Sequence, residues 1–240
     1  MKFLRKEWRK WLRIVWIGAG LSFLAWMWWG YRASGVPDGT FDSTGKVLVI
    51  RSNAGWEFRP AGIASGRRYI FLPGGMVDPE AYGPLLRKVA EAGHRAVLLR
   101  YPWNCGCTDS QVKGVFDVIT RTVQDGGDWI LGGHSRGAML AARFVHERNV
   151  PLAGLILMGT SHPRDFSLSS MTIPVLKISA SEDGVAEDGD VSLLPPSTRY
   201  VKISGGNHVQ FGYYGHQLFD GRAKISREEQ QRQVLAAMVD

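Results

Sequence analysis

A serine at position 135 lies in a short segment whose residue types could perform nucleophilic chemistry. The segment reads Gly-His-Ser-Arg-Gly over residues 133–137, and it lies between an apolar run and an Ala-rich run that is typical of a helix. A serine raised on a sharp strand-to-helix turn needs small neighbours, and Gly133 and Gly137 provide that room. The G-x-S-x-G pattern in this context therefore predicts Ser135 as a nucleophile.

A serine hydroxyl is a weak nucleophile at neutral pH, so it needs a base and a group that orients the base. Asp183 and then His208 follow two later apolar runs. Glu182 adjoins Asp183, and Asp165 follows the preceding run, so both are alternative acids. Neighbours in an extended segment point to opposite sides, and Glu182 is therefore expected to point away if Asp183 points in. These residues predict a Ser-His-Asp triad.

The same chemistry needs amide groups that stabilise the negative oxygen of a tetrahedral intermediate. The amide of Arg136, directly after the nucleophile, is one expected donor. The second is expected from Gly75 or Met76, in the turn "LPGGM" after an earlier apolar run. The side chain of Arg136 is expected to be solvated or in a salt bridge, although it could bind an acidic substrate. His134 is expected to be a hydrogen-bonded packing residue without a catalytic role.

Apolar runs alternate with helix patterns along the chain, which predicts an α/β fold with a mostly parallel sheet and helices on both faces. The first two runs form an expected antiparallel edge pair. Ligands of such sheets bind at the carboxyl ends of the strands, where the triad residues lie in the sequence. The expected strands are 46–50, 55–61, 67–75, 95–102, 128–133, 152–160, 173–180 and 198–206, and the expected helices are 78–94, 109–127, 136–149 and 226–239.

Over residues 45–240 the chain resembles the α/β-hydrolase superfamily, in which serine, acid and histidine follow one another in this order. More narrowly it is similar to the small bacterial "fold-5", dienelactone-hydrolase-like group, through "FLPGGMVDPEAYGPLLRKVAEAGHRAVLLRYP", "GGHSRGA" and "GGNHVQFGYYGHQ". The resemblance implies a serine hydrolase of esters or related acyl bonds, without a metal or an organic cofactor. Two features depart from the pattern: "PGG" replaces His-Gly, and serine replaces the cysteine of true dienelactone hydrolases.

The stretch between Thr160 and Ile173 is short, so no large cap domain and an open, shallow pocket are expected. The acidic run 181–190 lacks the spacing of an EF-hand and is expected to be a solvated loop. Cys105 and Cys107 have no ligand cluster at zinc spacing around them. They could bond each other, although one intervening residue makes that uncommon, pair between molecules or stay free.

The formal charge of +7 is concentrated at the N-terminus. Residues 1–32 carry +6, which leaves +1 for residues 33–240, too little to bind a phosphate backbone. Nucleic acid is therefore not an expected partner. The charged residues of the first segment are Lys2, Arg5, Lys6, Arg9, Lys10, Arg13 and Arg32, against Glu7.

Residues 14–29 contain no charged side chain, and tryptophans lie near both ends of this run. Such a segment is long enough to cross a bilayer as a helix, and a basic flank stays in the cytoplasm. We expect an uncleaved, single-pass signal anchor over residues 1–32, a linker over 33–45 and an extracytoplasmic catalytic domain over 46–240. A cleaved signal peptide and a buried helix of a soluble protein are the alternatives.

The sequence thus predicts a membrane-anchored serine hydrolase that acts on a small-molecule acyl substrate. An acyltransferase with the same triad, or a non-catalytic binding module on the same fold, are alternative functions. The sequence leaves the oligomeric state open.

Overall fold

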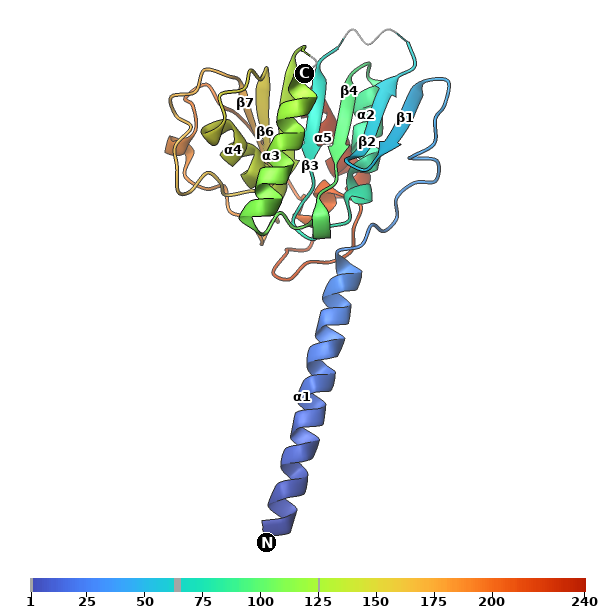
Figure 1. Ribbon diagram of the computed structural model, residues 1–240, viewed down its shortest axis with the longest axis vertical. Helices are drawn as coiled ribbons and strands as arrows, with labels where there is room; N and C mark the ends of the chain where they lie inside the picture. Colours follow the sequence, from blue (N-terminus) through green and yellow to red (C-terminus); the bar gives the residue numbers. More distant parts are fainter. Residues whose placement is uncertain (1, 63–65, 125) are drawn as a thin grey trace.

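The computed structural model describes residues 2–62, 66–124 and 126–240, with the backbone alone for residues 2–6. A sheet with helices on both faces forms the body of the molecule, and one long helix extends from it (Figure 1). The predicted α/β architecture is therefore confirmed.

The sheet has eight strands in the order β1-β2-β4-β3-β5-β6-β7-β8. β1 and β2 form the expected antiparallel edge pair, β2 also pairs antiparallel with β4, and the remaining neighbours are parallel. The carboxyl ends of the parallel strands therefore share one edge of the sheet. The strands are β1 (Val47–Ser52), β2 (Gly55–Pro60), β3 (Arg68–Leu72), β4 (Arg95–Leu99), β5 (Trp129–His134), β6 (Gly154–Met158), β7 (Val175–Ala180) and β8 (Arg199–Ile203).

Two layers of helices bury the two faces of the sheet. Because successive side chains of a strand point to opposite faces, Tyr69 and Phe71 of β3 join one core, and Ile70 and Leu72 join the other. The first core is closed by α2 (Gly83–Glu91) and α5 (Arg227–Val239), and the second by α3 (Asp109–Val123) and α4 (Arg136–Glu147). The sheet is thus buried on both sides, as its apolar runs predict.

Two of the helices, α3 and α5, begin where the sequence places capping residues. The Thr108 side chain accepts from the Gln111 amide in a capping box at the start of α3, and Ser226 caps α5. The single helix expected over 78–94 is instead a short 3-10 turn, η1 (Pro79–Tyr82), followed by α2. Pro84 in the first turn of α2 has no amide to donate, which favours a separate helix start there.

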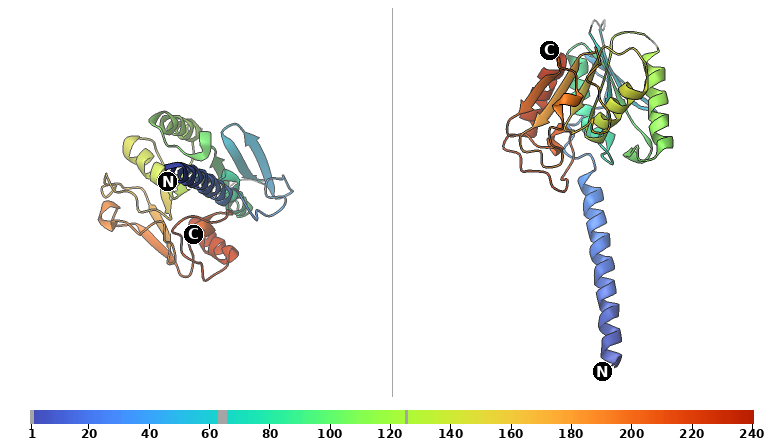
Figure 2. Two further views of the ribbon diagram at one scale, coloured as in Figure 1. Left: turned by 90° about the horizontal axis from the view of Figure 1, so that it is seen from below. Right: turned by 90° about the vertical axis from the view of Figure 1, so that its left-hand side faces the viewer.

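Helix α1 (Lys2–Gly30) projects from the body of the molecule (Figures 1 and 2). Its segment Glu7–Gly30 has 24 residues and is long and apolar enough to cross a membrane, although a signal sequence would share these properties. At 1.5 Å per residue it extends about 36 Å, more than the ~30 Å hydrocarbon core of a bilayer.

Residues 33–45, expected as a linker, are packed against the body. Ala33 forms a β-bridge with Tyr214, and Thr40 is buried. The ring of Phe41 lies 5.4 Å from that of Trp56. The connection between α1 and the sheet is therefore a packed segment and not a free tether.

Candidate active site

Ser135 stands on a sharp turn between β5 and α4. Its backbone has φ 54° and ψ −117°, a conformation that residues with a side chain rarely adopt. The Ser135 amide donates to the Met158 carbonyl oxygen at 2.9 Å, which fixes the turn to the end of β6. A Cβ atom on Gly133 would overlap the backbone of Gly137, and a Cβ atom on Gly137 would overlap the carbonyl oxygens of Leu72 and Pro73, so both positions require glycine. The residue is partly exposed, as a nucleophile must be.

His208 and Asp183 form a buried pair. The Nδ1 atom of His208 lies 2.8 Å from Oδ2 of Asp183, and both side chains are almost fully buried. The other carboxylate oxygen of Asp183 accepts from the amides of Val185 and Ala186 at 2.9 and 2.8 Å. An ionised carboxylate only accepts hydrogen bonds, so the Nδ1 atom of His208 carries the proton. The Nε2 atom has no hydrogen-bond partner among the described residues and is left as an acceptor.

The pair lies beside the serine turn. His134, the residue before Ser135, has its ring centre 4.4 Å from that of His208. The segments after β5, β7 and β8 thus bring the His208–Asp183 pair next to the residue that precedes Ser135. The Nε2 atom of His208 is not hydrogen-bonded to Ser135, and the assignment of the three residues to one triad stays a prediction.

The alternative acids lie elsewhere. Glu182 forms a salt bridge with Lys224 at 2.9 Å and accepts from the Ser181 hydroxyl, so it points away from His208 as expected. Asp165 is exposed to solvent. Only Asp183 of these carboxylates contacts the His208 ring.

Two amides at the turn have no hydrogen-bond acceptor among the described residues. Arg136 is the first residue of α4, and its amide has no acceptor among the described residues. The Gly75 amide also has no acceptor among the described residues. A Cβ on Gly75 would lie 3.0 Å from Cδ of Arg136, so the turn after β3 and the start of α4 are in contact. The Met76 amide instead donates to the Asn104 carbonyl oxygen. The geometry therefore favours Gly75 over Met76 as the second donor.

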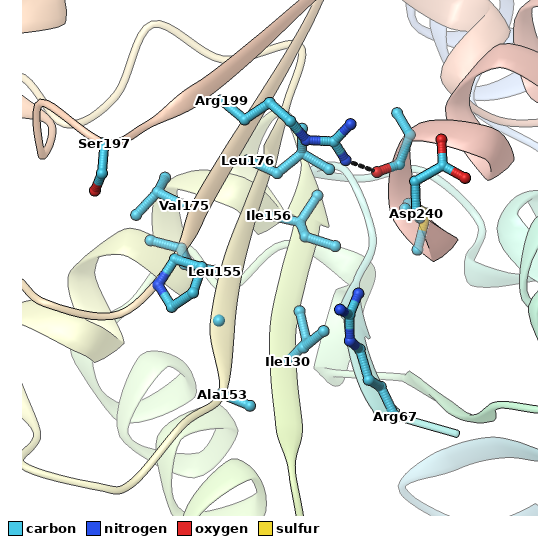
Figure 3. A pocket seen from close by; sticks show the side chains of 14 residues that line it. Arg67, Ile130, Ala153, Leu155, Ile156, Val175, Leu176, Ser197, Arg199 and Asp240 are labelled. Carbon is cyan, nitrogen blue, oxygen red and sulfur yellow. Dashed lines mark hydrogen bonds between the residues drawn. The ribbon is translucent and has the colours of Figure 1, made fainter. Parts of the chain in front are cut away.

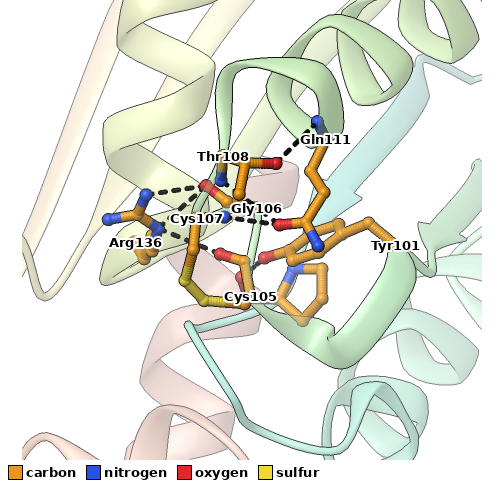
Figure 4. The surroundings of a disulfide bond; sticks show 8 residues. Tyr101, Cys105, Gly106, Cys107, Thr108, Gln111 and Arg136 are labelled. Carbon is orange, nitrogen blue, oxygen red and sulfur yellow. Dashed lines mark hydrogen bonds between the residues drawn. A yellow bond between two sulfur atoms is a disulfide. The ribbon is translucent and has the colours of Figure 1, made fainter.

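The Arg136 side chain is partly buried and, among the described residues, is bonded to backbone carbonyl oxygens and not in the expected salt bridge. Its Nε atom donates to the Cys105 carbonyl oxygen at 2.9 Å, and a terminal nitrogen donates to that of Gly106 at 2.6 Å (Figure 4). Cys105 and Cys107 are joined by a disulfide, with Cα atoms 5.1 Å apart. The sequence allowed a bond within the pair, a bond between molecules or free thiols, and the structure shows the bond within the pair. Arg136 thus ties the serine turn to this loop.

Two residues that contact the candidate site were not identified from the sequence. The Tyr82 hydroxyl lies 2.8 Å from Nδ1 of His134 and accepts from the Gly74 amide at 3.1 Å, which connects the turn after β3 to the serine turn. Asp220 accepts from the backbone amides of His208 and Val209 at 3.0 Å. Tyr82 lies in a helix and Asp220 in an irregular loop, so neither follows a strand and no sequence pattern marks them.

A cavity of about 310 Å³ lies at the opposite edge of the sheet (Figure 3). It is formed by the first residues of β6, β7 and β8 together with Asp240, and Arg199 donates across it to the Ala237 carbonyl oxygen. Ligands of parallel sheets bind at the carboxyl ends of strands, so this cavity is not the candidate active site. Within the part of the chain that the structure describes, no group of three or more His, Cys, Asp or Glu residues could hold a metal ion.

Comparison with known proteins agrees with this fold. The family model of the "Alpha/beta hydrolase family" matches residues 68–232. No curated protein matches the chain significantly. Solved structures with the same fold include a predicted CIB-like hydrolase from Thermoplasma acidophilum, with 12% identity and a TM-score of 0.62 over 80% of this chain and 98% of that one.

A ferulic acid esterase from Streptomyces cinnamoneus has 15% identity and a TM-score of 0.56, over 75% of this chain and 68% of its own. The protein TT1662 from Thermus thermophilus has 16% identity and a TM-score of 0.54, over 80% of this chain and 96% of its own. At these identities the structures show a shared fold, and the family match covers most of the chain. The chain is therefore a hydrolase that belongs to the alpha/beta hydrolase family.

Proposed function

We propose that this hydrolase cleaves a carboxylic ester or related acyl bond through an acyl-enzyme on Ser135. One observation carries the proposal. The buried His208–Asp183 pair, with its 2.8 Å contact, lies beside a serine that is held in a conformation costly for any residue with a side chain. Such a cost is expected where the strained residue has a functional role.

The proposed reaction follows from the positions of the donors and acceptors. The Nε2 atom of His208 takes the Ser135 hydroxyl proton while Oγ attacks the acyl carbonyl, and Asp183 stabilises the imidazolium. The amides of Arg136 and Gly75 bind the oxygen of the tetrahedral intermediate. His208 then protonates the leaving alkoxide as the C–O bond breaks. Water, deprotonated by His208, attacks the acyl-enzyme, and His208 then returns that proton to Oγ of Ser135 as the acid is released.

The proposal includes the location of the enzyme. Residues 1–32 act as a signal anchor whose basic flank stays in the cytoplasm, and residues 33–45 connect it to the catalytic domain, residues 46–240, outside the membrane. The support is the charge distribution of the sequence and the length of α1.

Hydrolysis of p-nitrophenyl esters of graded acyl length by the full chain in detergent tests this proposal. Wild type should release p-nitrophenol in a steady state, and Ser135→Ala should lower kcat by about a thousandfold or more. Ser170→Ala, at an exposed serine, is the matched control and should keep wild-type activity. If Ser135→Ala keeps wild-type activity, the acyl-enzyme mechanism is wrong.

A further inference from the structure

A groove of about 360 Å³ lies between the last turns of α1 and the turn after β3. Its volume falls in the range of ligand sites, roughly 300–1,000 Å³. The residues that α1 contributes recur at helical spacing and form one face of the helix, which is mostly apolar. The groove is lined by Phe23, Leu24, Met27, Trp28, Tyr31 and Arg32 from the N-terminal segment, and by Met76, Asp78 and Asn104 from the body.

The groove ends next to the candidate oxyanion site. Met76, in its wall, is bonded through its amide to Asn104, also in its wall. The preceding residue, Gly75, packs against Arg136, which directly follows the nucleophile. A molecule that lies in the groove therefore has one end beside Gly75, in the turn that would bind the oxygen of a reacting carbonyl.

The wall formed by α1 is held in place by direct contacts with the body. The Tyr31 carbonyl oxygen accepts from the Asp78 amide, and the Gly30 carbonyl oxygen accepts from the Gly215 amide, both at 2.9 Å. The ring of His216 stacks on that of Trp26 with centres 3.9 Å apart. The N-terminal segment therefore supplies one wall of the groove.

Exposed apolar side chains mark the same end of the body. Met76, Trp103 and Phe219 are 63%, 88% and 85% exposed. They lie in segments after β3, β4 and β8, at the carboxyl ends of the strands, and α1 leaves the body at this end (Figure 1). Apolar and aromatic side chains in such a position suit a membrane interface.

We infer that the substrate is a membrane-resident lipid ester with a long acyl chain, which enters along α1 and lies in this groove with its carbonyl at Ser135. The inference rests on the proposed function. An acyl chain that moves from the bilayer into a groove lined by the membrane helix does not cross water, so its entry exposes no apolar surface. Because lipid tails and the groove are similarly apolar, the groove contributes orientation of the carbonyl more than affinity.

The full chain in vesicles of phosphatidylcholine and phosphatidylglycerol tests the inference with two probes that share a leaving group. One is 4-methylumbelliferyl palmitate, which partitions into the bilayer, and the other is the water-soluble butyrate. Leu24→Trp and Met27→Trp each fill the groove. Ala25→Trp places the same ring on the same helix, at an exposed residue outside the groove lining, and is the matched control.

Each groove variant should lower kcat/KM for the palmitate by about tenfold or more and leave that for the butyrate within about twofold. Ala25→Trp should leave both unchanged. Butyrate hydrolysis also reports that each variant is folded. Equal losses on both esters, or no loss in either groove variant, would contradict the inference. If wild type hydrolyses only the butyrate, the lipid substrate is wrong and the proposed function stands. If it hydrolyses neither ester, the proposed function itself fails.

Discussion

At the scale of single residues, two aspartates contact His208 in different ways. Asp183 bonds its ring, whereas Asp220 bonds the backbone amides of residues 208 and 209. Burial raises the pKa of Asp220, which its two amide bonds oppose only in part. Asp183 is therefore in the position that fixes the ring tautomer, and Asp220 in the position that fixes the loop.

Asp183→Asn should lower kcat by about a thousandfold or more, because a carboxamide donor opposite Nδ1 favours the wrong tautomer of His208. Glu182→Gln is the matched control: it adjoins Asp183 but pairs with Lys224, and it should keep activity within about twofold. Steady-state hydrolysis of p-nitrophenyl butyrate measures both. Similar losses in the two variants would contradict the assignment of the acid.

His134 should make the stability of the protein depend on pH. Burial, with a smaller contribution from the charge of His208, holds the pKa of His134 well below its ordinary value of 6.5. Below that pH the unfolded chain binds a proton that the folded chain does not. The free energy of unfolding contributed by this residue therefore falls with decreasing pH, by at most about 1.4 kcal/mol per pH unit.

His134→Gln removes this titration while keeping an acceptor for the Tyr82 hydroxyl. Thermal unfolding of the full chain in detergent between about pH 7.5 and about pH 5.5 measures the effect. Between these two pH values the Tm of the variant should decrease less than the Tm of wild type. An equal loss would show that His134 is not a buried neutral residue.

At the scale of elements, the serine turn depends on close packing of α4 against the end of β3. A Cβ on Gly137 would overlap the carbonyl oxygens of Leu72 and Pro73, which are backbone atoms and cannot rotate away. Gly114 on α3 is exposed, and a Cβ there would meet nothing within 4 Å. The two glycines therefore serve different purposes, although both lie in helices.

Gly137→Ala should lower Tm by about 5 °C or more, since overpacking costs about 2 kcal/mol or more in a domain of this size. Gly114→Ala should raise Tm by about 2 °C, because alanine favours a helix by about 0.5–1 kcal/mol. Differential scanning fluorimetry of the full chain in detergent distinguishes them. A Gly137→Ala variant as stable as wild type would contradict the packing of the turn.

The strands and most of the helices could be predicted from the sequence because they have local causes. Buried parallel strands require uninterrupted apolar runs, and the Thr108 and Ser226 caps mark helix starts. The position of Ser135 was predictable because its turn requires glycine at fixed spacing. The part played by Tyr82 was not, because its hydrogen bond joins residues 52 positions apart, and a helical tyrosine usually only packs.

At the scale of the whole molecule, α1 leaves the body at the end where the carboxyl ends of the parallel strands lie (Figure 1). The sequence predicted the helix and the edge separately. Their proximity depends on Ala33, Gly30 and Tyr31 contacting residues far along the chain, such as Tyr214 and Gly215. Such contacts leave no periodic pattern, so the groove between α1 and Met76 could not be predicted.

The orientation of the chain can be tested with alkaline phosphatase fused after Asp240 in a bacterial host, since this reporter is active only outside the cytoplasm. The fusion should be active, because the basic flank of α1 stays inside. Replacing Arg5, Lys6, Arg9 and Lys10 by glutamate should lower that activity. Exchanging each of these arginines for lysine and each lysine for arginine keeps the charge and should leave the activity unchanged. An inactive fusion with the native flank would contradict the proposed topology.

Reaction of the full chain with a fluorophosphonate probe, followed by mass spectrometry of the labelled peptide, tests the central claim most directly. The probe forms a stable bond only with a serine that has an activating base. The account predicts a single adduct on Ser135 in wild type, and its loss in Ser135→Ala and in His208→Ala. Labelling at another serine, or no labelling of folded protein, would contradict the account.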